Sequence, residues 1–181
     1  MIKLFCASLL LGLLAACQSS PVATDYDTGT QFKQYRYYQL AATAPDDNAL
    51  MQKRLMAAID KHTSLSGLQK TEQAQAHTLL LTPLLRSQQR TQEPNSRGGI
   101  GLGSGGGGSF FGISLSVPLS SETLVNDVNI VITLTDTESN KVVWQGSYAF
   151  TVSADDPAAA DEQVDKAVAE IMSSYPPKPS D

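Results

Sequence analysis

The chain has 181 residues, 41% of them hydrophobic, and a formal net charge of −5 at pH 7. This length and composition fit a single domain with a packed core. An acidic chain without a basic cluster binds nucleic acid and anionic headgroups poorly, so we expect no nucleic-acid partner.

Residues 1–17 combine the features of an export signal. Lys3 supplies a positive charge, and residues 4–14 form an apolar run shorter than the about 20 residues that span a bilayer. Ala15 and Ala16 are the small residues that a signal peptidase requires. An ordinary secretory signal followed by a chance cysteine would share these features.

Leu14-Ala15-Ala16-Cys17 resembles the bacterial lipobox. The resemblance implies cleavage between Ala16 and Cys17, with lipid attached to the Cys17 thiol and then to its freed amine. Lipoproteins retained at the inner membrane typically carry Asp in the next position, where this chain has Gln18. The resemblance therefore implies a protein anchored by its N-terminal lipid to the periplasmic face of the outer membrane, and two or more acyl chains give stable anchoring.

The expected domain organisation follows from this signal. We predict a signal peptide over residues 1–16, a lipidated N-terminus with a flexible tether over 17–30, one domain over 31–175 and a disordered tail over 176–181. Cys6 and Cys17 are the two cysteines, so the processed chain has no disulfide and no free thiol.

Residues 32–40 are rich in aromatics and lack Gly and Pro, which predicts a strand. The period of two places Phe32 and Tyr38 on one face and Tyr35 and Tyr37 on the other. These tyrosines either line a half-buried sheet or contact a partner, and we take Tyr35 and Tyr37 as candidate contacts.

Two amphipathic helices are predicted. The first begins at Asp46 or Asp47 and ends near Leu65, because Gly67 is a natural left-handed cap. The second begins at Asp156, directly before a proline. Their apolar stripes comprise Met51, Leu55, Ala58, Ile59, His62 and Leu65 in the first, and Val164, Ala167, Val168, Ile171, Met172 and Tyr175 in the second.

The strongest strand signals surround residues 136–140, a cluster of turn formers. Residues 125–135 and 141–152 alternate on either side, which predicts a hairpin. We expect Val142 and Trp144 on its buried face, with Trp144 a core anchor. Residues 77–90 predict another strand, whose Pro83 requires a sheet edge or a bulge.

A glycine-rich segment covers residues 94–109. Its Gly101, Gly103 and Gly106 match a dinucleotide-binding pattern, but a strand-like alternation follows in place of the required helix. We expect a mobile excursion between two strands. Alternatively, the loop orders on a partner or lipid surface through Phe110 and Phe111.

Catalytic and metal-binding patterns are weak. His62 and His77 are the two histidines, and neither has metal-ligand spacing or an evident catalytic partner. We therefore expect no enzyme activity, no cofactor and no metal.

These elements together predict an α+β fold, a two-layer sandwich with two helices packed on one face of a mostly antiparallel sheet. Several stretches resemble domain-of-unknown-function family 4136, a group of bacterial envelope lipoproteins. They are Asp25-Tyr26-Asp27 followed by Phe32 and Tyr35, the helix end Leu65-Ser66-Gly67-Leu68, the glycine-rich loop, and Leu134-Thr135-Asp136 leading to Val142-Val143-Trp144-Gln145-Gly146. The resemblance supports the location and the fold, and supplies no catalytic residue.

Two functions remain open from the sequence. The chain is expected to dock an envelope protein of unknown identity through a sheet face or an edge strand, as an assembly or maintenance module. Alternatively, it binds a lipid or small molecule in a pocket between the sheet and the helices.

Overall fold

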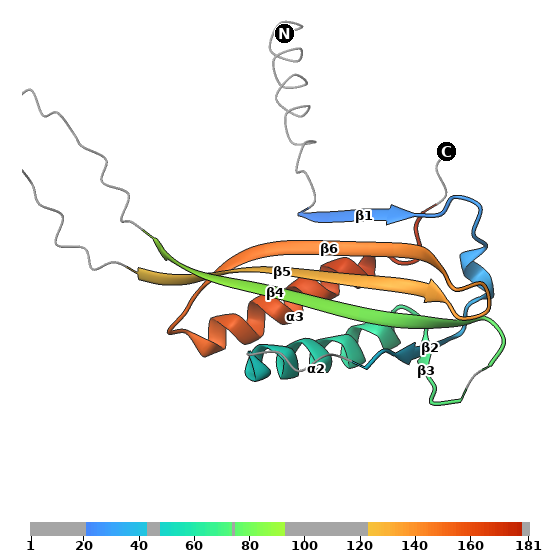
Figure 1. The fold of residues 1–181 in the computed structure, drawn as a ribbon, viewed down its shortest axis with the longest axis horizontal. Coiled ribbons are helices and arrows are strands. Elements are labelled where there is room, and N and C mark those ends of the chain that lie inside the picture. The colour runs from blue at the N-terminus through green and yellow to red at the C-terminus, as the bar shows by residue number, and fades with distance from the viewer. Residues whose placement is uncertain (1–20, 43–47, 74, 93–122, 179–181) are drawn as a thin grey trace, which may run out of the picture.

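The computed structural model describes residues 21–42, 48–73, 75–92 and 123–178. One six-stranded sheet has the order β1-β6-β5-β4-β2-β3, and two helices lie together on one of its faces (Figure 1). The neighbouring pairs from β1 to β4 are antiparallel, whereas β2 runs parallel to both β4 and β3. The predicted α+β two-layer sandwich is confirmed.

The elements have the following bounds: β1 (Val22–Tyr26), a 3-10 turn (Phe32–Gln34), β2 (Tyr37–Leu40), α2 (Ala49–Leu65), β3 (Gln69–Lys70), β4 (Thr78–Gln92), β5 (Thr123–Asp136), β6 (Lys141–Ser153) and α3 (Pro157–Ser173). Neither helix within these ranges is long and apolar enough to cross a membrane.

Both helices begin at a capping side chain, but only α3 begins at the predicted residue, because the cap of α2 is Asn48 and not Asp46 or Asp47. The backbone N–H of Ala159 donates to the Asp156 carboxylate at 2.9 Å, as predicted for α3. In α2 the cap is Asn48, whose side-chain oxygen accepts from the Met51 N–H at 3.2 Å. The expected caps Asp46 and Asp47 lie outside the described residues. Gly67 has φ +84° directly after α2, which confirms the predicted end of this helix.

The predicted hairpin is β5–β6, and a bulge changes which of its residues are buried. Leu134 pairs with Trp144, but the next residue, Thr135, pairs with Val142. Val143 is therefore the extra residue of a bulge. As a result Val143 and Trp144 are buried while Val142 is 56% exposed. The expectation that Val142 faces the core was wrong, and that for Trp144 was right.

The predicted flexible tether is wrong for residues 22–26, which form the edge strand β1. This strand pairs antiparallel with β6, from Val22 opposite Tyr148 to Tyr26 opposite Trp144. Val22 and Tyr26 are half-buried and pack against the core, while the three residues between them are exposed. Pairing with β6 therefore orders a segment that buries little surface of its own.

A series of aromatic rings in edge-on contact packs at the end of the core where β1 meets β6. Tyr26 packs edge-on against Phe32, Phe32 against Tyr175, and Tyr175 against Trp144, with ring centroids 5.6 to 6.1 Å apart. The four rings come from β1, the 3-10 turn, the residues after α3 and β6, so they tie both ends of the domain to the sheet.

Candidate docking surface

The sheet face turned away from the helices carries mainly polar side chains. Val128 and Ile130 of β5 are buried under the helices, so their alternate neighbours face outward. The polar members of this outer face include Arg86, Gln88, Arg90, Asp127, Asn129, Thr133, Gln145, Ser147 and Thr151.

One long edge of this sheet belongs to β4. Along its whole length β4 pairs with β5, but on its other side β2 pairs only with residues 78–81. No strand among the described residues borders residues 82–92 on that side. The second half of β4 is therefore an open edge, and we call residues 82–92 the β4 edge.

Two hydrogen bonds fix which backbone groups face this edge. The carbonyl of Leu81 accepts from the Ala41 N–H at 2.9 Å, on the β2 side. The carbonyl of Thr78 accepts from the Thr137 N–H at 3.2 Å, on the β5 side. Backbone groups alternate along a strand. Even-numbered residues of β4 therefore bond to β5. Odd-numbered ones point to the other side, which β2 occupies as far as Leu81 and which is the open edge beyond it.

Pro83 fits this alternation. As an odd-numbered residue, it places its missing N–H at the open edge, where no ladder bond with β5 is lost. Of the two alternatives predicted at Pro83, an edge or a bulge, the described residues show an edge: the register with β5 is continuous at Pro83, whereas residues 78–81 are interior to the sheet.

Beyond Pro83 the edge offers unpaired donors. The backbone N–H groups of Leu85, Ser87, Gln89 and Thr91 have no hydrogen-bond partner among the described residues. All but Leu85 belong to exposed residues. Such a row of alternating N–H and C=O groups is the template to which another strand can add.

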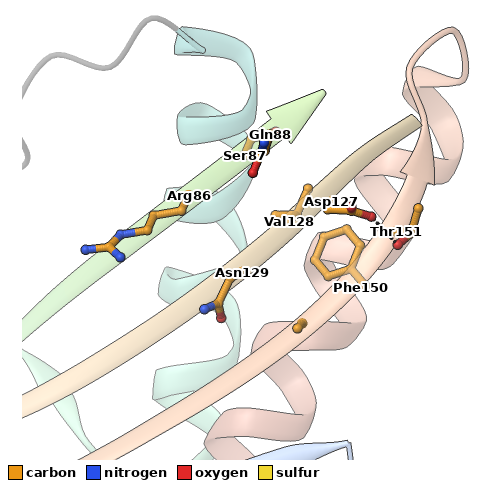
Figure 2. A pocket seen from close by; sticks show the side chains of 9 residues that line it. Arg86, Ser87, Gln88, Asp127, Val128, Asn129, Phe150 and Thr151 are labelled. Atoms are coloured by element: carbon orange, nitrogen blue, oxygen red, sulfur yellow. Dashed lines mark hydrogen bonds between the residues drawn. The ribbon is translucent and has the colours of Figure 1, made fainter. Parts of the chain in front are cut away.

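A shallow hollow of about 550 Å³ adjoins this edge. Figure 2 shows its lining residues on three neighbouring strands. They are Arg86, Ser87 and Gln88 of β4, Asp127, Val128 and Asn129 of β5, and Ala149, Phe150 and Thr151 of β6. Six of these nine have outward-facing side chains, and neither α2 nor α3 contributes to the lining. The hollow therefore belongs to the outer face and is not a pocket between sheet and helices.

Two arginines of the β4 edge differ in their surroundings. Arg90 donates to both oxygens of Asp127, and the Thr151 hydroxyl donates to the same carboxylate at 2.6 Å. These bonds hold the pKa of Asp127 below its usual value, with Arg90 the largest cause. Arg86 makes no ion pair with any described residue and lies directly opposite the uncharged Asn129.

A known family accounts for almost all of the described chain. The model of a domain of unknown function, DUF4136, matches residues 22–177. The chain belongs to the DUF4136 family. This confirms the resemblance seen in the sequence.

Comparison with solved structures finds several that resemble this DUF4136 protein at low identity. A PDZ domain protein from Parabacteroides distasonis is 15% identical over 89% of this chain, with a TM-score of 0.54. The alignment spans only 36% of that structure. A DUF4136 family protein from Bacteroides thetaiotaomicron is 13% identical over 86% of this chain and 95% of its own, with a TM-score of 0.44.

A minor lipoprotein from Acinetobacter baumannii is 9% identical over 77% of this chain and 87% of its own, with a TM-score of 0.35. Among curated proteins, no sequence matches this DUF4136 chain.

The structure corrects one candidate contact residue. The 3-10 turn interrupts the expected alternation, so Tyr35 and Tyr38 both enter the core and are only 6% and 1% exposed. Burial also raises the pKa of Tyr35. Tyr35 therefore cannot form the expected patch with Tyr37, which is half-buried between Gln69 and Thr78 of the neighbouring strands.

The other predicted site residues lie outside the described ranges. They are Ala16 and Cys17 of the lipid attachment site, Phe110 and Phe111, and the glycine-rich segment 94–109. Within the described ranges, no group of three or more His, Cys, Asp or Glu side chains is placed to hold a metal ion.

Sequence reasoning located the edge but could not say which of its backbone groups are unpaired. The change from apolar to polar residues after Leu85 was visible in the sequence. Which backbone groups of this stretch remain unpaired depends on how β4 is aligned with β2 and β5. That alignment cannot be read from the sequence of β4 alone.

Proposed function

We propose that this DUF4136 protein is an outer-membrane lipoprotein that docks an envelope protein by strand addition and catalyses no reaction. Acylation at Cys17 would hold it at the periplasmic face. The observation that carries the docking function is the β4 edge, where four N–H groups from Leu85 to Thr91 have no partner in the part of the chain that the structure describes.

The composition of this edge suits a surface that a partner can reach better than one buried in the core. Proteins usually protect open edges with charges, prolines or bulges, because an unprotected edge aggregates. Here Pro83 separates the open stretch from β2, and two arginines and several polar residues keep it soluble. The backbone groups themselves stay available, which allows a partner strand to add with hydrogen bonds as the source of affinity.

A crosslink in living cells tests the docking function. We would replace Gln89, whose side chain is exposed on the edge strand, with a photo-reactive residue, and place the same residue at exposed Glu162 of α3 as the control. We expect an adduct with one envelope protein from position 89 and none from position 162.

A proline variant then tests whether that adduct depends on strand addition. Ser87→Pro removes an edge-facing N–H without touching the bonds to β5, so the adduct should disappear while the protein stays folded. An adduct that persists in Ser87→Pro would argue against strand addition.

The lipid anchor has an independent test. Cells supplied with radiolabelled palmitate should label the native protein and leave Cys17→Ser unlabelled. The native protein should sediment with outer membranes. Labelling that survives in Cys17→Ser, or sedimentation with inner membranes, would overturn the proposed anchor or its location.

A further inference from the structure

We infer that the strand added to the β4 edge is antiparallel and acidic, with a carboxylate opposite Arg86 and an apolar residue two positions later. This inference rests on the docking function proposed above and names the chemistry of the partner segment. Taking the added strand as antiparallel, its sequence pattern follows from charge, register and exposure along residues 82–92.

The charge of the β4 edge differs in sign from that of the protein. The chain carries a net charge of −5, yet residues 82–92 contain two arginines and no acidic residue. Asp127 already neutralises Arg90 from the neighbouring strand. Arg86 is left without an ion-pair partner among the described residues, and an opposite charge directly across from it on an added strand would form a stabilising pair.

The position of Arg86 in the ladder favours a partner from the open side. Its own backbone groups bond to β5, where the opposite residue is Asn129. An antiparallel strand on the other side would therefore meet Arg86 at a non-hydrogen-bonded pair. At such pairs the Cα atoms are only about 4.5 Å apart and the side chains are closest. A carboxylate at this position would complete the missing ion pair.

Leu84 supplies the second element of the pattern. It lies on the same outer face two residues before Arg86 and is 44% exposed beside half-buried Val131. Because an antiparallel partner runs in the opposite direction, the residue two positions after its carboxylate lies opposite Leu84. An apolar residue there would cover the exposed Leu84 side chain.

Synthetic peptides test this inference on the full-length protein in detergent. The first probe is a nine-residue, acetylated and amidated strand-forming peptide with a central Glu and a Leu two positions later. The second replaces that Glu with Gln. Binding is followed by nuclear magnetic resonance, through the amide signals of Leu85, Ser87, Gln89 and Thr91.

We expect the Glu peptide to bind about two- to fivefold more tightly than the Gln peptide, as for a cross-strand ion pair. Salt at 1 M should reduce this preference. Arg86→Gln should remove it, while Arg36→Gln should keep it, because Arg36 is exposed in the loop before β2.

The outcomes separate this inference from the docking function. Equal binding of both peptides, lost in Ser87→Pro, would overturn the acidic preference and leave strand addition standing. No change at the edge amides with either peptide at millimolar concentration would overturn the inference. Dimers of the native protein that Ser87→Pro abolishes would instead assign the edge to a second copy of the chain.

Discussion

Gly146 of β6 faces the indole ring of Trp144 on the same strand. A β-carbon at Gly146 would lie 2.5 Å from Cη2 of Trp144 and 2.8 Å from Cγ2 of Ile171 in α3. The absence of a side chain is thus what allows the Trp144 ring to lie flat between sheet and helix. Trp144 is fully buried, so the ring cannot move outward to make room.

Gly146→Ala should therefore destabilise the domain by about 1 to 3 kcal/mol, the usual cost of overpacking a core. Urea unfolding followed by Trp144 fluorescence measures this directly. Gly29→Ala is the matched control, because a β-carbon there would meet only the Asp27 carboxylate, at 3.3 Å. Equal stability of the two variants would contradict the tight packing at Gly146.

At Tyr175, by contrast, we predict a substitution that does not destabilise the domain. Its ring packs edge-on against Trp144 and Phe32, but its buried hydroxyl has no hydrogen-bond partner among the described residues. Burial raises the pKa of this hydroxyl, so it stays protonated at any physiological pH. Tyr175→Phe keeps the ring contacts and removes an unsatisfied polar group.

We expect Tyr175→Phe to leave the free energy of unfolding unchanged or to raise it by up to about 1 kcal/mol. Tyr175→Ala should lower it by about 3 to 5 kcal/mol, because the whole ring is lost. A clear loss of stability in Tyr175→Phe would show that the hydroxyl has a partner after all. Thermal unfolding of the three proteins in parallel decides between these results.

Parts of this fold were predictable because their signals are local. The apolar alternation at Val128, Ile130, Ile132 and Leu134 predicted β5, and the turn formers after it predicted the hairpin. The cap at Asp156 with the following proline predicted the start of α3. Each of these signals lies within one segment of the chain.

Other parts depend on distant partners. In β1 only Val22 and Tyr26 turn toward the core, and the strand forms because β6 presents an edge 120 or so residues away along the chain. The burial of Tyr35 depends on the 3-10 turn before it, and the exposure of Val142 depends on a bulge. Local alternation could not reveal either irregularity, which is why Tyr35 was mistaken for a surface residue.

The alternation of backbone N–H groups along the β4 edge, between β5 and the open side, gives a stability prediction that needs no partner protein. Ser87 points its N–H to the open side, whereas Gln88 bonds to β5 opposite Asp127. Ser87→Pro should therefore change the free energy of unfolding by less than about 1 kcal/mol, and Gln88→Pro should lower it by about 2 kcal/mol or more. Urea titrations of both variants test the assignment. A larger loss of stability in Ser87→Pro than in Gln88→Pro would mean that the N–H of Ser87, and not that of Gln88, bonds to β5.

Asp165 of α3 makes ion-pair and hydrogen-bond contacts to α2. Its carboxylate oxygens accept from Lys61 Nζ, each at 2.9 Å, and one oxygen lies 2.9 Å from His62 Nε2. The Lys61 hydrogen bond is the largest of the contacts that hold the pKa of Asp165 below its usual value. The Asp165 side chain is 42% exposed, so the solvent weakens this interaction.

A carboxyl whose pKa is lower in the folded state than in the unfolded state stabilises the fold above the unfolded pKa. That contribution is lost as the pH falls through the folded pKa. At pH 7 Asp165→Asn should therefore be less stable than the native protein by about 0.2 to 1 kcal/mol. The difference should shrink as the pH falls below the usual carboxyl value of about 4. Glu162→Gln removes the same charge from the exposed side of α3 and serves as the control. A stability difference for Asp165→Asn that stays constant from pH 7 to pH 2 would mean that the Lys61 and His62 contacts do not stabilise the pairing of α2 with α3.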